Sequence, residues 1–506
     1  MEENKNNAEK NTISRGDFLK KSAIAAASFY IVPRHVLGKG YKAPSDKLYI
    51  AAVGTGGEAE NDIHHFATAP KKNAEIAFLC DVDDRPGAQR RKQFPKAKFY
   101  YDWREMFDKE HKNFDAVTVA IPDHNHAIVG LGAMQLRKHL YLQKPLTHDI
   151  YEARILTEAS KKYGVVTQMG DQGASCDGMR TLREWFEAGL IGDIEKVYCW
   201  TDRPVWPQGI SWPTAKPPIP SELKWDLWLG TAQHVDYIDN LVPFNWRGWW
   251  QFGTGALGDM GCHIMGPPFK LFELGYPTMI SGSASTVYTG IFKEGVFPES
   301  GPVSSHIKYD FTLKNGKPLE LHWMDGGITP DRLSELDPDI NMNEALGDIP
   351  SENDFEGCTL FIGTKGKVSC GWGGSHPRLL PLSLNKDVHV PEKYPRVEGG
   401  MDGHWWQFVD AAIAGYGKME VDSPFEGYAG PLTETVLLGN LLLRSFDIQE
   451  KIKRNDPVYG NMEGLKFSGR YVGLKWDAEN KLVTNYDPAN QFIRRTYREG
   501  WGDLKL

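Results

Sequence analysis

Apolar runs alternate with helix-like stretches along the chain from residue 47 to about residue 170. Lys47–Val53 and Ala74–Val82 are short, apolar and rich in small or β-branched residues, as buried strands are. The other strands predicted here are Lys98–Tyr101, Asp115–Ile121, His139–Leu142 and Val165–Met169. The helices predicted between them include Trp103–Glu110, His126–Arg137 and Ile150–Tyr163. This β–α alternation predicts an α/β domain over residues 46–170, built on a doubly wound, mainly parallel sheet.

The strict alternation stops near Gly170, and we expect a second domain over residues 171–506. Strands recur there, and Lys314-Asn315-Gly316-Lys317 is typical of a tight hairpin turn. Because such a turn joins antiparallel strands, the pattern predicts an α+β domain with a mainly antiparallel sheet. The strands predicted in it are Thr278–Tyr288, Ser304–Leu313, Leu319–Asp325, Thr359–Gly363 and Lys367–Cys370. The segment Leu465–Tyr497 has the pattern of an arm that contacts another subunit, so a homo-oligomer is expected.

Residues 1–45 have the pattern of a targeting leader. A polar stretch leads into Ser14-Arg15-Gly16-Asp17-Phe18-Leu19-Lys20-Lys21, and the apolar run Ser22–Val32 follows, which is too short to span a bilayer. The segment resembles a twin-arginine signal in which Gly16 replaces the second arginine. Export to the periplasm is therefore expected, and the alternative is an amphipathic N-terminal helix. No later stretch reaches about 18 unbroken apolar residues, so no membrane span is predicted.

The first predicted strand ends in a glycine-rich turn that is typical of dinucleotide sites. Gly54–Ala59 fits the pattern G-x-G-x-x-A, between a strand and a helix. Gly54 allows the tight turn, Gly56 lets the backbone approach a pyrophosphate, and the small Ala59 lets the helix pack on the strand. Asp81 follows about 20 residues later, where an acidic residue accepts hydrogen bonds from a ribose. Together these residues predict a dinucleotide-binding domain of the Rossmann type.

Asp81 also bears on the choice of cofactor. A carboxylate there accepts hydrogen bonds from both ribose hydroxyls and repels a 2′-phosphate, which favours NAD over NADP. Arg85, Arg90 and Arg91 lie just downstream and offer positive charge for a phosphate. NAD is therefore the expected cofactor, with NADP as the alternative.

Three further motifs make a family resemblance specific. Pro122–His126 and Gln143-Lys144-Pro145 fall at strand ends, and Asp259-Met-Gly-Cys-His263 lies in the second domain. With the glycine turn and Asp81, they resemble the Gfo/Idh/MocA family of glucose–fructose oxidoreductase, inositol dehydrogenase and rhizopine-catabolism enzymes. The resemblance implies a Rossmann domain, a C-terminal domain on an open, mostly antiparallel sheet, and hydride transfer between a sugar-like carbinol and a nicotinamide. The family motif is E-K-P, so Gln143 is a departure beside a retained lysine.

The resemblance and the chemistry of alcohol oxidation together suggest catalytic roles. Oxidation of a secondary alcohol needs a base for the hydroxyl proton, and Asp259 and His263 would share one face of a helix at i, i+4. We predict His263 as the general acid/base, Asp259 as the carboxylate that orients it, and Lys144 as a proton relay or oxyanion stabiliser. The alternative is a helix-stabilising pair and a surface lysine.

The remaining site predictions concern cofactor and substrate. Trp246, Arg247 and Trp249 are candidates for stacking on sugar faces and bonding hydroxyls, with a packed loop as the alternative. The resemblance implies that Gln168 and Gln172 touch cofactor or substrate, and that His126 caps a helix beside the nicotinamide. No metal site is predicted, because His124 and His126 have no third partner. The predicted cofactor-binding residues are Gly54, Gly56, Gly57, Ala59, Asp81, Pro122, His126, Gln143, Lys144 and Gln168, and the predicted substrate-binding residues are Trp246, Arg247, Trp249 and Gln172.

Composition narrows the function classes. The net charge of −8 argues against a nucleic-acid or anionic-membrane partner, both of which call for a basic excess. The six cysteines are widely spaced and are predicted to be buried thiols. The sequence therefore predicts an NAD-dependent oxidoreductase acting on a sugar, glycoside or cyclitol. The alternatives are an NAD-dependent glycosidase that uses transient oxidation at C3 with elimination, and a non-catalytic sugar-binding protein.

Overall fold

The fold is known from a computed structural model that describes residues 46–347, 357–458 and 460–506. The chain divides into the units Met1–Asp46 and Lys47–Leu506, and the fold below is that of the second unit. The predicted leader, residues 1–45, lies outside the described residues. No described helix combines the length and the apolarity that crossing a bilayer requires.

The first half of the unit folds around a six-stranded sheet in the order β3-β2-β1-β4-β5-β6, with every neighbouring pair parallel. Its strands are β1 (Leu48–Val53), β2 (Ala74–Cys80), β3 (Lys98–Tyr100), β4 (Ala116–Val119), β5 (His139–Gln143) and β6 (Thr167–Gly170). The strand order turns back between β1 and β4, as in doubly wound dinucleotide-binding sheets. The predicted parallel sheet is confirmed.

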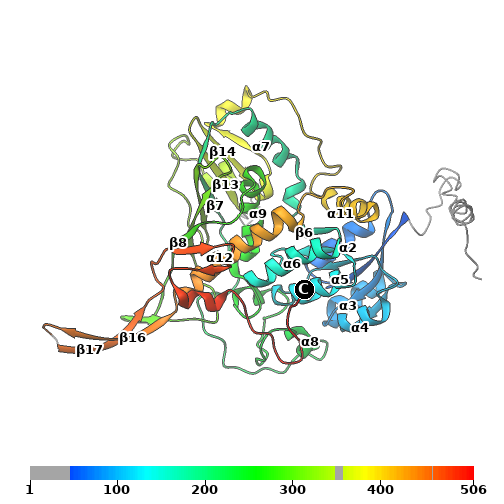
Figure 1. The fold of residues 1–506 in the computed structure, drawn as a ribbon, viewed down its shortest axis with the longest axis horizontal. Coiled ribbons are helices and arrows are strands. Elements are labelled where there is room, and N and C mark those ends of the chain that lie inside the picture. Colours follow the sequence, from blue (N-terminus) through cyan, green and yellow to red (C-terminus); the bar gives the residue numbers. More distant parts are fainter. Residues whose placement is uncertain (1–45, 348–356, 459) are drawn as a thin grey trace, which may run out of the picture. The chain divides into compact units, whose positions relative to one another are not determined.

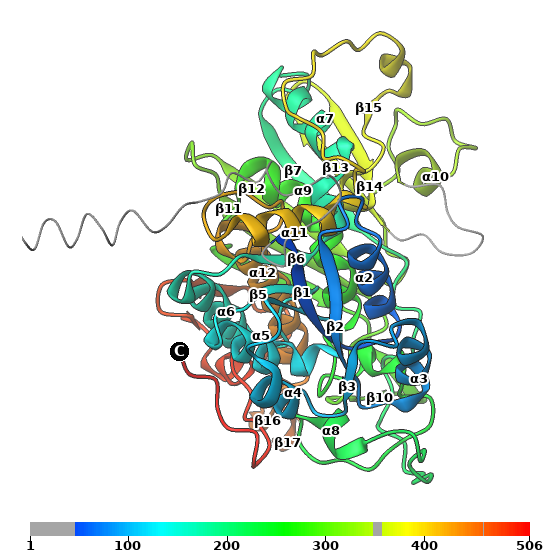
Figure 2. The ribbon, with the colours of Figure 1, turned by 90° about the vertical axis from the view of Figure 1, so that its right-hand side faces the viewer.

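Helices cover both faces of this sheet, with α2 and α3 on one side and α5 and α6 on the other (Figure 2). They are α2 (Glu58–Ala67), α3 (Asp84–Gln93), α4 (Trp103–Glu110), α5 (His126–Gln135) and α6 (Ile150–Tyr163). Local sequence sets several helix ends. Asp149 caps α6 in a capping box with Glu152, and Gly164 ends it in the left-handed conformation.

A mixed, mostly antiparallel nine-stranded sheet forms the second half, in the order β15-β14-β13-β7-β12-β11-β8-β18-β19. Only β7 and β12 pair in parallel within it. Its strands are β7 (Ile194–Trp200), β8 (Met279–Ala284), β11 (Ser305–Thr312), β12 (Pro318–Met324), β13 (Cys358–Gly363), β14 (Lys367–Gly371), β15 (Arg378–Leu380), β18 (Leu474–Asp477) and β19 (Leu482–Val483). The expected Asn315-Gly316 hairpin joins β11 to β12, so the predicted fold class is confirmed.

Two small hairpins stand apart from this sheet. One is formed by β9 (Val287–Gly290) and β10 (Lys293–Gly295), so the single strand predicted over Thr278–Tyr288 is in fact β8 followed by β9. The other, β16 (Gln449–Asp456) with β17 (Gly460–Phe467), projects away from the body of the unit (Figure 1).

The helices of the second half connect the two sheets. They are α7 (Asp177–Glu187), α8 (Trp225–Leu229), α9 (Gly255–Phe272), α10 (Met342–Leu346), α11 (Gly403–Ala414) and α12 (Gly430–Ser445). The buried, apolar α12 packs against both α9 and α6. Trp405 and Phe408 of α11 join the apolar core beneath α2. The region predicted as a second domain therefore contributes a helix to the core of the first.

All six cysteines are buried and unbridged. This agrees with the prediction of buried thiols.

Candidate active site

The turn between β1 and α2 has the geometry of a phosphate cradle. Gly54 has a φ of +99°, and an added Cβ there would lie 2.1 Å from the carbonyl oxygen of Ala120. Gly57 also has a positive φ, and a Cβ on it would meet open space. Gly57 precedes α2 without a side-chain cap. The amides of Ala59 and Glu60 donate to the backbone oxygens of Gly56 and Gly57, so an anion would bind the amides that precede them. The turn therefore fits a dinucleotide pyrophosphate.

Asp81 lies directly after β2, where a ribose carboxylate was expected. Its Oδ2 accepts hydrogen bonds from the Thr55 amide at 2.8 Å and the Thr55 hydroxyl at 2.7 Å, and its Oδ1 accepts one from the Asp83 amide at 2.9 Å. Burial raises its pKa, and these hydrogen bonds offset part of the rise. Asp81 thus braces the glycine turn, and a carboxylate with about four acceptor positions retains capacity for a ribose hydroxyl.

The three arginines downstream of β2 are each paired with an acid. The Arg85 Nε lies 2.8 Å from Asp83 Oδ1, and Arg91 Nη2 lies 2.7 Å from Asp84 Oδ1. Arg90 forms an ion pair with Glu60. A 2′-phosphate would therefore meet carboxylates as well as guanidinium groups, which favours NAD over NADP.

His126 joins the two turns that follow β4 and β5. Its Nδ1 lies 2.9 Å from the carbonyl oxygen of Pro145, and its Nε2 lies 2.7 Å from that of Ile121. The ring is 1% exposed. Both ring nitrogens are thus used within the protein, and the place beside the nicotinamide stays a prediction. Pro122, half-buried, opens the turn that His126 closes.

Lys144 crosses from the end of β5 to the first turns of α9. Its Nζ donates to the backbone oxygen of Asp259 at 2.6 Å and lies 3.2 Å from Asp259 Oδ1. Arg247 Nε lies 3.3 Å from the same Oδ1, and Arg203 Nη1 lies 3.9 Å from Oδ2. Burial alone would raise the pKa of Asp259, but the charges of these three cations outweigh it and hold the pKa below its usual range. Asp259 is therefore an anchor for Lys144 whose ionised form is favoured by its cationic neighbours.

The sequence suggested that Asp259 orients His263, but in the structure a different carboxylate bonds the histidine. Its Nδ1 lies 2.8 Å from Oδ1 of Asp171, and both side chains are buried. The two residues do follow one another by a helical turn on α9, but the carboxylate of Asp259 meets the three cations instead. Tyr428 donates its hydroxyl to Oδ2 of Asp171 at 2.7 Å.

Sequence reasoning missed Asp171 and Tyr428. Asp171 follows β6 directly, so the rule that placed Lys144 after β5 would have found it. Tyr428 carries no local signal, because it lies 257 positions from Asp171 along the chain.

The predicted glutamines separate into two groups. Gln143 Nε2 donates to Oδ1 of Asp62 at 2.9 Å, and Gln172 Nε2 donates to Oε1 of Glu58 at 3.2 Å. Both therefore lie at the acidic start of α2, beside the glycine turn. Gln168 is fully buried and donates to the backbone oxygen of His404. Its amide nitrogen is used in packing α11, and the cofactor contact predicted for Gln168 stays a prediction.

Asp62 explains the departure from E-K-P. It is fully buried on α2, its pKa is raised well above the usual value by burial and by Glu58, and it accepts from both Gln143 and Trp405. A third carboxyl at position 143 would add like charge to this buried group, whereas the glutamine donates to it.

Trp246 and Trp249 belong to an apolar cluster around α8. They are 6% and 3% exposed, so neither ring offers a face to a sugar. The alternative of a packed loop is therefore the one observed. Arg247, between them, reaches Asp259, and its guanidinium lies 4.4 Å above the ring of Trp246.

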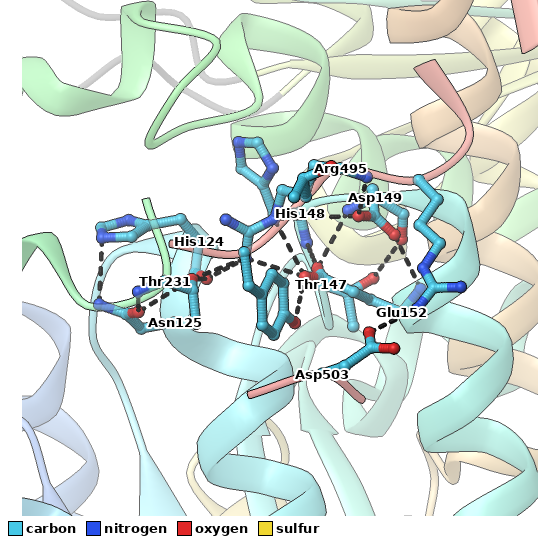
Figure 3. Close-up of polar contacts among 12 residues, drawn as sticks. His124, Asn125, Thr147, His148, Asp149, Glu152, Thr231, Arg495 and Asp503 are labelled. Atoms are coloured by element: carbon cyan, nitrogen blue, oxygen red, sulfur yellow. Dashed lines mark hydrogen bonds and ion pairs between the residues drawn. The ribbon is translucent and has the colours of Figure 1, made fainter. Parts of the chain in front are cut away.

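Arg495 packs behind the site turns from a distant part of the chain (Figure 3). Its Nη2 donates to Oε1 of Glu152 at 2.8 Å and to the Thr231 hydroxyl at 2.9 Å, and it also bonds the backbone oxygen of His124. Its amide donates to Oδ2 of Asp149 at 3.1 Å. The segment expected to contact another subunit thus bonds the turn after β4 and the start of α6 within its own chain.

The doubly wound sheet carries a glycine turn after β1, and Lys144 and Asp171 follow two of its later strands. This arrangement places the chain among dinucleotide-binding proteins of the Rossmann type. Residues 48–171 match the family described as "Oxidoreductase family, NAD-binding Rossmann fold", and residues 194–275 match its "C-terminal alpha/beta domain". These two stretches are similar to the Gfo/Idh/MocA oxidoreductase family.

Relatives within the family are distant. Levoglucosan dehydrogenase of Pseudarthrobacter phenanthrenivorans is 23% identical over 188 residues, which span 37% of this chain and 40% of that protein. Inositol 2-dehydrogenase of Salmonella typhimurium is 26% identical over 126 residues, 24% of this chain and 37% of that protein. The matched stretches thus cover well under half of these relatives. A solved structure of levoglucosan dehydrogenase with NADH and L-sorbose shares the fold, with a TM-score of 0.52 and 15% identity over 78% of this chain and 96% of that one.

Proposed function

We propose that the protein is an NAD-dependent oxidoreductase that moves a hydride between a carbinol carbon of a sugar, glycoside or cyclitol and a nicotinamide. The observation that carries the proposal is the meeting of Lys144, from the end of β5, with Asp259 on α9, one helical turn before His263. Relatives named for levoglucosan and inositol support a polyhydroxylated ring as the substrate.

The residues of the first domain fit NAD. The open space at Gly57 and the uncapped start of α2 suit a pyrophosphate, and Asp81 suits the adenosine ribose. When bound, NAD supplies the carbon that accepts or returns the hydride. The paired arginines after β2 support NAD rather than NADP.

Three side chains have separate roles at the substrate oxygen. His263 accepts the hydroxyl proton at Nε2, which has no hydrogen-bond partner among the described residues. The Lys144 ammonium donates a hydrogen bond to the same oxygen and stabilises the negative charge that develops on it. Asp259 holds Lys144 in place through its backbone oxygen and its carboxylate.

The test joins a cofactor measurement with a variant. Purified full-length protein is denatured and the released nucleotide is identified by mass spectrometry, and NADH formation is then followed with a panel of sugars, glycosides and cyclitols. His263→Ala should lower kcat by about 10²- to 10⁴-fold, as loss of a general base does, while the Kd for NAD stays within about threefold. The matched control is the exposed His234→Ala.

Turnover of His263→Ala within a few-fold of wild type would remove His263 from the mechanism. The product distinguishes the related chemistries: a keto-sugar with NADH supports the dehydrogenase, and a cleaved glycoside without net NADH supports a redox-assisted glycosidase. If the purified protein binds no nicotinamide nucleotide, the proposed function is wrong.

A further inference from the structure

The carboxylate of Asp171 lies in a buried group that includes His263 and Tyr428. Oδ1 is 2.8 Å from Nδ1 of His263, and Oδ2 accepts the Tyr428 hydroxyl at 2.7 Å. The side chains of His263 and Asp171 are only 4% and 2% exposed. Each oxygen of one carboxylate therefore has its own partner, away from bulk water.

The hydrogen positions in this group follow from what each atom is able to do. Burial, reinforced by the charge of Asp171, raises the pKa of Tyr428 well above its usual value, so the phenol keeps its hydrogen and donates it. A carboxylate only accepts hydrogen bonds. In a neutral imidazole one nitrogen donates and the other accepts, so Nδ1 carries the hydrogen and Nε2 has the free lone pair.

We propose that Asp171 is the positioning residue of the site: it holds His263 with the hydrogen on Nδ1, so that Nε2 is the atom that takes the substrate proton. This inference rests on the proposed function for its catalytic consequence, but not for the geometry. Asp171 itself does not touch the substrate in this account and acts only through His263.

The surroundings of the group fit this role. A Cβ on Gly266 of α9 would lie 2.8 Å from the Tyr428 hydroxyl and 3.2 Å from Asp171 Oδ2, so the glycine leaves the space that their bond occupies. The ring of Trp372 packs beside that of His263, with the two ring centroids 4.5 Å apart. The imidazole is thus held by a hydrogen bond at one nitrogen and by an aromatic ring beside it.

Asp259 does not provide this orientation, although it lies on the same helix as His263. Its carboxylate lies within 3.3 Å of Lys144 and Arg247. The site therefore uses two carboxylates for two separate tasks, Asp259 for the lysine and Asp171 for the histidine.

The test measures the tautomer of His263 directly. Full-length protein labelled with ¹⁵N in its histidine rings is studied by NMR well above the ordinary histidine pKa of about 6.5, and the His263 signals are assigned by their loss in His263→Ala. Wild type should show hydrogen on Nδ1. Asp171→Asn should move part or all of the hydrogen to Nε2, because the amide group of asparagine donates to Nδ1. Tyr428→Phe should leave the tautomer unchanged, since the Asp171–His263 bond remains.

Kinetics provide the second readout. Asp171→Asn should lower kcat by as much as about 10⁴-fold, the loss that follows when the orienting carboxylate of a histidine base in a hydrolase becomes an amide, with the KM for NAD unchanged. In the His263→Ala background the same change should alter kcat less than about twofold, because a residue that acts through His263 has nothing left to position.

Each outcome of these measurements supports or overturns the assignment of Asp171. An unchanged tautomer in Asp171→Asn, or an equal loss of kcat in both backgrounds, would overturn the proposal. If the protein transfers no hydride but the tautomer changes as expected, the proposed function falls and the structural assignment of Asp171 stands. Tyr428→Phe also guards against misfolding, because it removes a buried hydrogen bond of the same group without removing the carboxylate.

Discussion

Two buried histidines lie behind the turns that carry the site residues, and their surroundings differ. His124 has its ring nitrogens 3.3 Å from the Phe252 oxygen and 3.1 Å from the Trp228 oxygen. His148 has two buried ring nitrogens without a hydrogen-bond partner. Burial, and then the charge of Arg495, lowers the pKa of both, to about 3 for His124 and well below the usual value for His148. Both rings therefore stay neutral at a pH where exposed histidines are protonated.

His148→Leu should stabilise the protein in weak acid. Between the unfolded pKa of about 6.5 and the lower folded pKa, the unfolded chain binds a proton that the folded chain does not. This histidine therefore lowers the free energy of unfolding by about 1.4 kcal/mol for each pH unit below 6.5. The variant lacks this contribution and should exceed wild type by an amount that grows as the pH falls. Urea unfolding of both proteins at about pH 5 and about pH 7.5 measures the difference.

The exposed His234 supplies the control for this experiment. His234→Leu should leave the pH dependence of stability unchanged, because folding does not remove this side chain from water. An equal gap between wild type and His148→Leu at both pH values would contradict the prediction.

At the scale of elements, the segment after β19 acts as a brace for the first domain. It includes the 3₁₀ turn Asp487–Phe492 and Arg495, whose guanidinium bonds Glu152 at the start of α6. Glu152 is 1% exposed and also accepts the Tyr497 hydroxyl at 2.6 Å. A buried acid with a single guanidinium partner makes the brace sensitive to loss of that cation.

Arg495→Met should lower the free energy of unfolding by about 3–5 kcal/mol, because it leaves Asp149 and Glu152 buried without their cation. Denaturant unfolding checks the value. The control is the neighbouring Arg494→Met, whose ion pair with Asp503 is about half exposed and should cost less than about 1 kcal/mol. The double variant Arg495→Met with Glu152→Gln should recover part of the loss. Equal losses of the free energy of unfolding for Arg495→Met and Arg494→Met would refute the assigned brace.

At the scale of the whole unit, the hairpin of β16 and β17 should be the least protected regular structure. Its two strands pair only with one another among the described residues, and their described side chains are largely exposed. A two-stranded hairpin alone is marginally stable, whereas α12 is buried along almost its whole length.

Hydrogen exchange followed by mass spectrometry should therefore show the amides of β16 and β17 exchanging orders of magnitude faster than those of α12. The measurement is repeated over a range of protein concentrations. Slow exchange in the hairpin that speeds up on dilution would show instead that a second copy of the chain covers it, as the expected homo-oligomer allows.

The sequence predicted what local patterns encode. The six parallel strands follow from apolar runs and their spacing, and the glycine turn and the lysine after β5 follow from rules about strand ends. It did not predict that β7 lies between β12 and β13, or that α11 packs beneath α2, because these neighbours are far apart in sequence. The same holds within the site, where helical spacing suggested that Asp259 serves His263, but charges from three other segments decide its partner.

The bond between Arg495 and Glu152 closes a loop of 343 residues. Closing so long a loop has a large entropic cost that is recovered only when the contacts on both sides are already in place. The turn after β4 and the start of α6 should therefore acquire this support late in folding. During synthesis, the first domain emerges from the ribosome long before Arg495 is made. The first domain of a newly made chain should thus lack this support until Arg495 has emerged and entered its place.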